Sequence, residues 1–207
     1  FDGCTTRAVS FSNSVAGSAL IGCTFINMAA TACSFGTSTF AIGCIGYNNA
    51  TGTFLSTADG VLWINCIDAN PTGGSAEGFN LGGAATIAIN CFTYGGAGTA
   101  WANTTTALGT SFMFNCGGPS KDADTAAYCI EGFVTLTADP FTNAAGLDFS
   151  LNNVAGGGAL LKAAGVPETW QGLSTTSYID IGAVQTQAAV DTDRAAQLIS
   201  SQSLVSA

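Results

Sequence analysis

The cysteines are the most regularly spaced reactive residues in this chain. A cysteine thiolate can bind a metal, attack an electrophile or form a disulfide. Six of the eight cysteines directly follow a Gly or an Asn, at steps of 19, 21, 22, 25 and 25 residues; they are Cys4, Cys23, Cys44, Cys66, Cys91 and Cys116. A recurrence at about this period is typical of a solenoid. We therefore expect these six thiols to form a buried structural ladder.

A reduced ladder has two chemical alternatives. Equivalent residues of stacked parallel strands lie about 4.8 Å apart, a separation that a disulfide tolerates, so bridging along the ladder stays open. Cys33 and Cys129 fall outside the ladder and are the first candidates for a disulfide. A zinc site made only of cysteine usually needs closely spaced pairs, and the sequence has none. We expect no cofactor at the cysteines.

The candidates for catalysis are acids, because the chain has no histidine and therefore no Ser-His-Asp or Cys-His arrangement. Carboxylates paired across a groove can hydrolyse a glycosidic bond. Asp122, Asp124 and Glu131 are weak catalytic candidates, since a loop and the following strand could bring them together as an acid pair or a calcium site. The alternative is a set of ordinary solvated acids. Asp68 and Glu77 share one repeat, but no matching pair elsewhere supports them.

Aromatic side chains are the candidates for binding, because their faces can stack on sugars. Trp63 lies three residues before Cys66, and strand alternation puts it opposite Leu62 and Ile64. We therefore expect Trp63 to be exposed and name it as a weak binding residue. Trp101 falls on an inner aromatic row and is expected in the core, whereas Tyr47 and Tyr94 are further candidates for sugar stacking.

The residues around each ladder cysteine indicate the strands and turns that position the candidate side chains. Apolar residues stand four and two positions before the cysteines, which is the period of a strand with one buried face. We expect those positions and the cysteines to point inward. Asn27, Asn48 and Asn70, four residues after a cysteine, mark a turn. A second strand follows, marked by the aromatic residues Phe11, Phe35, Phe54, Phe79 and Trp101.

Repeats of this length with short strands and polar turns predict an all-β fold, a single-stranded parallel β-helix of about six or more coils over residues 1–138. Residues 139–186 differ in pattern and are expected to close the open end of the helix, which would otherwise expose strand edges. Residues 187–207 are expected to form a tail or a short helix with an apolar stripe, and they are a candidate for oligomer contacts.

The closing segment carries a resemblance. Its order is Asp139-Pro140-Phe141, then Asp148-Phe149-Ser150-Leu151, then Gly157-Gly158-Ala159-Leu160-Leu161 and finally Asp180-Ile181-Gly182-Ala183. This order resembles the closing segment of right-handed parallel β-helix repeat proteins, the pectate-lyase-like superfamily scaffold found in tailed phages and bacteria. The resemblance covers about residues 1–186. It implies the fold more than the function, because this scaffold carries lyases, hydrolases, adhesins and inert virion parts.

Charge excludes several partners. Only 8% of residues are charged, and the net charge is −9 with four basic residues, so we expect no nucleic-acid binding. The absence of a run of about 20 apolar residues argues against membrane insertion.

We predict that the chain is a non-enzymatic structural or adhesion component of a phage virion or other extracellular assembly. We expect it to self-associate as a homotrimer or an array and to contact other virion or surface proteins. A glycan is a candidate ligand. Two alternatives stay open, namely a polysaccharide depolymerase or lyase and a bacterial cell-surface or filament subunit.

Overall fold

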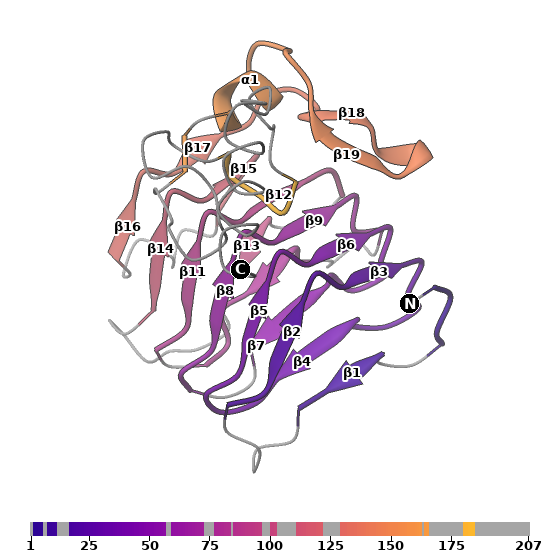
Figure 1. The fold of residues 1–207 in the computed structure, drawn as a ribbon, viewed down its shortest axis with the longest axis vertical. Coiled ribbons are helices and arrows are strands. Elements are labelled where there is room, and N and C mark those ends of the chain that lie inside the picture. The colour runs from indigo at the N-terminus through magenta and orange to yellow at the C-terminus, as the bar shows by residue number, and fades with distance from the viewer. Residues whose placement is uncertain are drawn as a thin grey trace, which may run out of the picture.

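The computed structural model describes residues 2–5, 8–11, 17–56, 59–72, 77–83, 85–96, 100–102, 111–121, 129–162, 164–165 and 180–184. Over these residues the chain winds into a parallel β-solenoid (Figure 1). Three parallel sheets form its walls, and consecutive strands of the chain belong to different sheets. The side chains that point inward from the three walls fill the inside of the solenoid.

Each sheet is built of short strands that lie one coil apart. Sheet A contains β3 (Thr24–Ile26), β6 (Ile45–Tyr47), β9 (Ile67–Ala69), β12 (Phe92–Tyr94), β15 (Gly117–Gly118) and β17 (Val134–Thr135). Sheet B contains β1 (Val9–Ser10), β4 (Cys33–Phe35), β7 (Phe54–Ser56), β10 (Phe79–Asn80) and β13 (Trp101–Ala102). Sheet C contains β2 (Ala19–Ile21), β5 (Phe40–Ile42), β8 (Leu62–Ile64), β11 (Ile87–Ile89), β14 (Phe112–Phe114) and β16 (Cys129–Glu131).

The parallel solenoid confirms the fold class expected from the cysteine period, but the number of coils was overestimated. The chain makes about four turns rather than six or more, which matches the span of sheet B from its first to its fifth strand. Counting one coil for each ladder cysteine gives too many coils. The first repeat, at Cys4, forms only an isolated bridge between Asp2 and Ile26 and no full coil.

Left-handed residues make the corners between the sheets. The residue before each ladder cysteine has a positive φ, for example +60° at Gly43 and +50° at Asn65, and it joins a strand of sheet C to the next strand of sheet A. Glycine and asparagine adopt this conformation at the lowest cost, which explains the Gly/Asn–Cys pattern. At the next corner Asn48 donates to Oδ1 of Asn27 at 2.6 Å, and Asn70 donates to Asn48 at 3.4 Å. This ladder confirms the predicted asparagine turns.

The corner also reverses which face of sheet C is inside. The inward residues are those three positions before the cysteine, such as Ala41, Trp63 and Ala88, all with 0% exposure. Unbroken strand alternation would place the residues two and four positions before the cysteine on the inside with it, but the left-handed residue shifts the alternation by one position. The residues four and two positions before the cysteine therefore point outward. The expectation that Trp63 is an exposed binding residue is wrong for the same reason.

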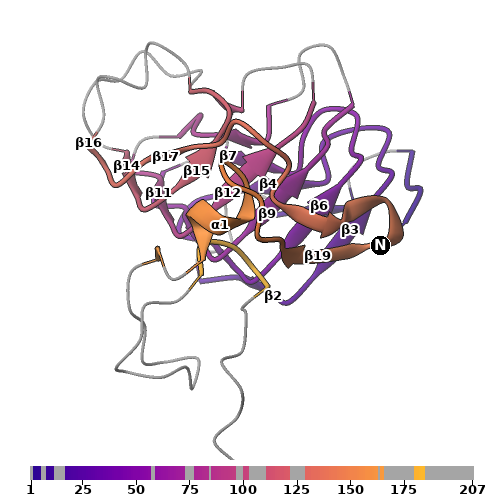
Figure 2. The ribbon, with the colours of Figure 1, turned by 90° about the horizontal axis from the view of Figure 1, so that it is seen from above.

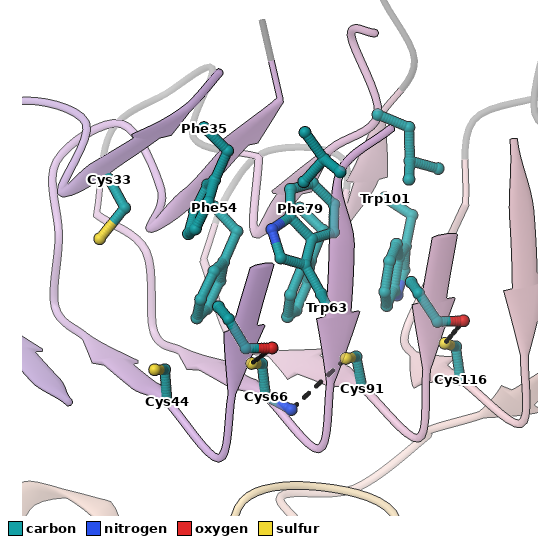
Figure 3. Close-up of a cluster of buried hydrophobic side chains, with 14 of the residues drawn as sticks. Cys33, Phe35, Cys44, Phe54, Trp63, Cys66, Phe79, Cys91, Trp101 and Cys116 are labelled. Atoms are coloured by element: carbon teal, nitrogen blue, oxygen red, sulfur yellow. Dashed lines mark hydrogen bonds between the residues drawn. The ribbon is translucent and has the colours of Figure 1, made fainter. Parts of the chain in front are cut away.

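Trp63 lies at the centre of the core (Figure 3), between the aromatic stack of sheet B and the cysteines. Its ring centroid is 5.5 Å from that of Phe79 and 6.1 Å from that of Phe54. Phe79 itself stacks on Phe54 at 4.7 Å and on Trp101 at 4.4 Å, so Trp101 is buried as predicted. Like side chains thus stack on one another along the solenoid axis.

The segment after the last coil folds back along the side of the solenoid. It forms the hairpin of β18 (Phe141–Asn143) and β19 (Asp148–Leu151), joined by a short 3-10 turn at Ala144–Gly146, and then helix α1 (Gly158–Leu161). Figure 2 shows the hairpin crossing sheet A. Its apolar side chains pack on outward residues of that sheet, including Ile67 and Phe92. Residues 139–162 therefore cover the outer face of sheet A, a placement that the expected role in closing the end of the rod did not anticipate.

Truncating Trp63 tests the inward assignment. Trp63→Ala should lower the free energy of unfolding by about 3–5 kcal/mol, because it leaves a large cavity between the aromatic stack and the cysteines. Trp63→Phe is the matched control and should cost much less, since it keeps a ring and removes Nε1, which is buried without a hydrogen-bond partner. Urea unfolding followed by far-UV circular dichroism measures both. Equal stability of Trp63→Ala and the parent chain would contradict the inward position.

Candidate functional site

The ladder cysteines form one inward row rather than a reactive centre (Figure 3). Cys44, Cys66, Cys91 and Cys116 have 0% exposure, whereas Cys4 and Cys23 are partly buried. All six thiols are free, and so is Cys33, which is buried in sheet B. The side chain of Cys129 lies outside the described residues. The thiols donate to carbonyl groups of neighbouring strands, as Cys116 does to Ala88 at 3.5 Å.

Burial keeps these thiols protonated. It raises the pKa of Cys66 and Cys91 and raises the pKa of Cys116 to about 12. The pKa of Cys44 is raised first by its hydrogen bond with the thiol of Cys66 and then by burial. A nucleophile or a metal ligand must be the thiolate, so this row is a structural core. Among the described residues, no cluster of three or more metal-ligating side chains occurs.

The acids named as catalytic candidates are not brought together by the described part of the fold. Asp122 and Asp124 lie outside the described residues. Glu131 ends β16 at the last strand of sheet C, and only its backbone is described. Elsewhere Glu77 lies beside a hollow near sheet B, where Asn80 donates to it, and Asp148 accepts from the backbone and hydroxyl of Ser150. Asp148 therefore acts as a hydrogen-bond acceptor within the hairpin.

Asp68 is buried in the interior of the solenoid. It has 0% exposure and accepts hydrogen bonds from the hydroxyl of Thr53 at 2.7 Å and from the amide of Thr53 at 3.2 Å. Asn49 donates to the same hydroxyl at 2.7 Å. The inward neighbour on the preceding coil is Gly46, where a Cβ would collide with Thr53. Burial raises the pKa of Asp68 to about 8, against the opposing effect of the two hydrogen bonds.

The candidate functional site is a cleft between the hairpin and sheet A, which we call the Tyr47–Tyr94 cleft. Three ring contacts hold the hairpin in place: Phe141 on Phe92 with centroids 5.5 Å apart, Phe149 on Tyr47 at 5.5 Å, and Phe141 on Phe149 at 5.7 Å. Asn152 ties the base of the hairpin by donating to the carbonyls of Asp139 and Phe141 at 2.8 and 2.9 Å.

The floor of the cleft is a gap in an aromatic row. Tyr47, Ala69 and Tyr94 are partners in register on β6, β9 and β12. Because neighbouring strands lie about 4.8 Å apart, the two tyrosines stand roughly 9.6 Å apart, and Ala69 between them is buried in the cluster that the hairpin forms with sheet A. The cleft has a volume of about 390 Å³ and is also lined by Asn70, Gly95, Asp139 and residues 141–145. This volume lies in the range of small-molecule sites.

Polar groups at the rim have unused hydrogen-bonding capacity. One oxygen of Asp139 accepts from the amide of Phe141 at 2.9 Å, and within the described part of the chain its other oxygen has no partner. Asn70 uses its amide nitrogen on Asn48, which leaves Oδ1 to accept. The hydroxyls of Tyr47 and Tyr94 likewise bond to none of the described residues. The cleft can therefore accept and donate several hydrogen bonds beside two aromatic rings.

The cleft suits binding better than acid–base hydrolysis. Among the described residues that line it, Asp139 is the one carboxylate, whereas glycoside hydrolysis generally uses two. The sequence indicates Tyr47 and Tyr94 as candidates for sugar stacking, but it does not indicate Ala69, Asp139 or the hairpin as parts of a site. The sequence gives little indication of these parts of the site, because the packing of a hairpin on a distant sheet produces no repeating pattern of residues.

Thiol labelling checks the reduced, buried ladder. In the native protein at pH 8, Cys33, Cys44, Cys66, Cys91 and Cys116 should react with a thiol reagent only at the rate of unfolding, because they are buried and protonated. After unfolding without a reductant, all eight cysteines should react within seconds. Fewer than eight reactive thiols in the unfolded, unreduced chain would reveal a disulfide and contradict this description.

Asp68 should make stability depend on pH. Its carboxyl has a pKa near 3.8 when unfolded and about 8 when folded, so the folded chain holds a proton that the unfolded chain releases. The contribution of Asp68 to stability is therefore greatest below pH 4 and falls as the pH rises to about 8, by at most about 1.4 kcal/mol per pH unit. Asp68→Asn mimics the protonated acid and should flatten this slope in urea unfolding across pH 4–8. An unchanged slope would refute the buried proton.

Comparisons with known proteins found no similar family, protein or structure: no protein-family model matches the chain, and no match was found among curated proteins or among solved structures. None of the helices in the described ranges is long and apolar enough to cross a membrane. The functional argument therefore rests on the solenoid and the Tyr47–Tyr94 cleft.

Proposed function

We propose that this chain is a non-enzymatic adhesion module of an extracellular assembly, either a phage virion or a bacterial surface structure, that binds a saccharide in the Tyr47–Tyr94 cleft. The observation that carries the proposal is the cleft lined by Tyr47 and Tyr94, which lie in register on either side of Ala69, with unused polar groups at its rim. Sugars present apolar ring faces and many hydroxyls, and this cleft offers a complement to both.

Charge narrows the class of saccharide. The chain carries a net charge of −9, and the only carboxylate among the described lining residues is Asp139. An anionic sugar would meet repulsion from the protein as a whole and from this acid. A neutral saccharide, whose hydroxyls can donate to Asp139 Oδ2 and Asn70 Oδ1, is the class that the cleft favours.

The rigid setting of the cleft supports recognition. Its floor belongs to consecutive strands of one sheet, and the rings of Phe141 and Phe149 anchor its wall. Sites on such elements lose little conformational freedom on binding. The further assignment to the right-handed, pectate-lyase-like scaffold rests on the motif order in residues 139–183, and the placement in a virion or on a cell surface is part of the same proposal.

Binding to immobilised glycans tests the function. We expect the full chain to bind one or a few neutral polysaccharides on an array of bacterial capsule and cell-wall glycans, and Tyr94→Ala to reduce this binding at least tenfold. The double variant Tyr47→Phe/Tyr94→Phe keeps both rings and removes both hydroxyls, so it should weaken binding less than Tyr94→Ala. Val154→Ala changes an exposed apolar residue that does not line the cleft and should leave binding unchanged.

Incubation with the bound polysaccharide separates adhesion from cleavage. The proposal predicts no new reducing ends and no unsaturated product. Release of oligosaccharides that is lost on Asp122→Ala, Asp124→Ala or Glu131→Ala would establish the depolymerase alternative instead. Binding that survives Tyr94→Ala unchanged would show that the saccharide sits elsewhere.

A further inference from the structure

The corner that follows sheet A carries a ladder of side-chain amides that ends in the Tyr47–Tyr94 cleft. The residues directly after β3, β6, β9 and β12 stack there one coil apart; they are Asn27, Asn48, Asn70 and Gly95. All four have a positive φ, between +51° and +80°. The fourth rung therefore continues the left-handed corner of the other three but has no side chain.

A carboxylate fixes the direction of this ladder. Asn27 donates through Nδ2 to Oδ1 of Asp2 at 3.1 Å, and an ionised carboxylate can only accept. The amide oxygen of Asn27 then faces the next coil, where Asn48 donates to it at 2.6 Å. The same constraint passes to Asn70, which donates to Asn48 at 3.4 Å. Every amide thus donates toward the N-terminal end of the solenoid, and the last oxygen, Asn70 Oδ1, is left over as an acceptor.

Asn70 Oδ1 adjoins the empty side-chain position of the fourth rung. A Cβ built on Gly95 would lie 3.3 Å from this oxygen. Both residues line the Tyr47–Tyr94 cleft, and no group of the described residues donates to the oxygen. Amides in such a chain polarise one another, which strengthens the last acceptor. The cleft therefore holds an oriented acceptor at the place where the next amide donor of the ladder would stand.

We propose that an amide of the ligand completes this ladder, so that the saccharide of the Tyr47–Tyr94 cleft is a neutral sugar with an acetamido group. The inference rests on the proposed saccharide-binding function and narrows its ligand. The N–H of the acetamido group donates to Asn70 Oδ1 above Gly95. Its carbonyl can accept from the hydroxyl of Tyr47 or Tyr94, which line the same cleft. The group is uncharged, so it avoids the repulsion that the net charge of −9 imposes on an anionic sugar.

An acetamido group matches this position better than a sugar hydroxyl does. It is a planar amide whose N–H can only donate, and side-chain amides fill the same position in the three preceding coils. It also brings a methyl group, which can pack on an aromatic ring. Tyr94 directly precedes Gly95 and is the nearest ring in the sequence. A hydroxyl at this place would keep one hydrogen bond and lose the apolar contact.

Binding to two pairs of neutral sugars tests the inference. Chitotetraose and cellotetraose differ by an acetamido group in place of a hydroxyl on each ring, and N-acetylgalactosamine and galactose differ in the same way. We expect the full chain to bind the acetamido member of at least one pair at least tenfold more tightly, as measured by isothermal titration calorimetry. Equal affinities within both pairs, or binding only of neutral sugars without an acetamido group, would overturn the inference and leave saccharide binding standing. Failure to bind any neutral saccharide would overturn both.

Filling the fourth rung supplies a matched variant. Gly95→Asn adds an amide that can donate to Asn70 Oδ1, although its Cβ would lie 3.1 Å from Cα of Asn70 and needs a shift of a few tenths of an ångström. We expect this variant to keep the far-UV circular dichroism spectrum of the parent and to lose the tenfold preference. Gly22→Asn adds the same side chain at another left-handed corner, where a Cβ meets nothing within 4 Å, and should leave binding unchanged. A folded Gly95→Asn variant that retains the preference would overturn the inference.

Discussion

The left-handed corner residue before each ladder cysteine is the constraint on which the rest of the structure depends. With φ values of +60° at Gly43 and +50° at Asn65, it turns the chain from sheet C into sheet A and shifts strand alternation by one position. Both the cysteine and the residue three positions earlier can therefore face inward. The aromatic stack, the row of thiols and the burial of Trp63 follow from this geometry, and so does an apolar outer face on sheet C.

The repeat length of the solenoid could be predicted from the sequence, but which face of each strand points inward could not. Stacked coils repeat their corner residues, so the Gly/Asn–Cys pattern and Asn27, Asn48 and Asn70 indicated a parallel solenoid and its turns. The inward or outward direction of a strand residue depends on every backbone conformation between it and the corner. One left-handed residue was enough to reverse the assignment of Trp63, and the truncated first repeat raised the expected number of coils.

The candidate site was less predictable than the fold because distant segments build it. Tyr47 and Tyr94 were visible as aromatic residues, yet their alignment across Ala69 depends on the register of three strands. The wall of the cleft comes from the hairpin that packs through Phe141 and Phe149. The acids that seemed most suggestive, at residues 122–131, have no described side chains. Asp68, which had no distinct sequence signal, is instead the buried carboxyl of the interior.

These features describe a solenoid with a chemically quiet interior and a polar-rimmed aromatic cleft of about 390 Å³. Such a molecule is suited to holding a ligand in a fixed position, and the central claim is that the ligand is a saccharide. A crystal structure of the full chain with a bound neutral oligosaccharide tests this claim most directly. The account predicts an intact sugar ring in the cleft, packed against Tyr47 or Tyr94 and hydrogen-bonded to Asp139. A sugar bound elsewhere on the solenoid, or one cleaved in the crystal, would contradict it.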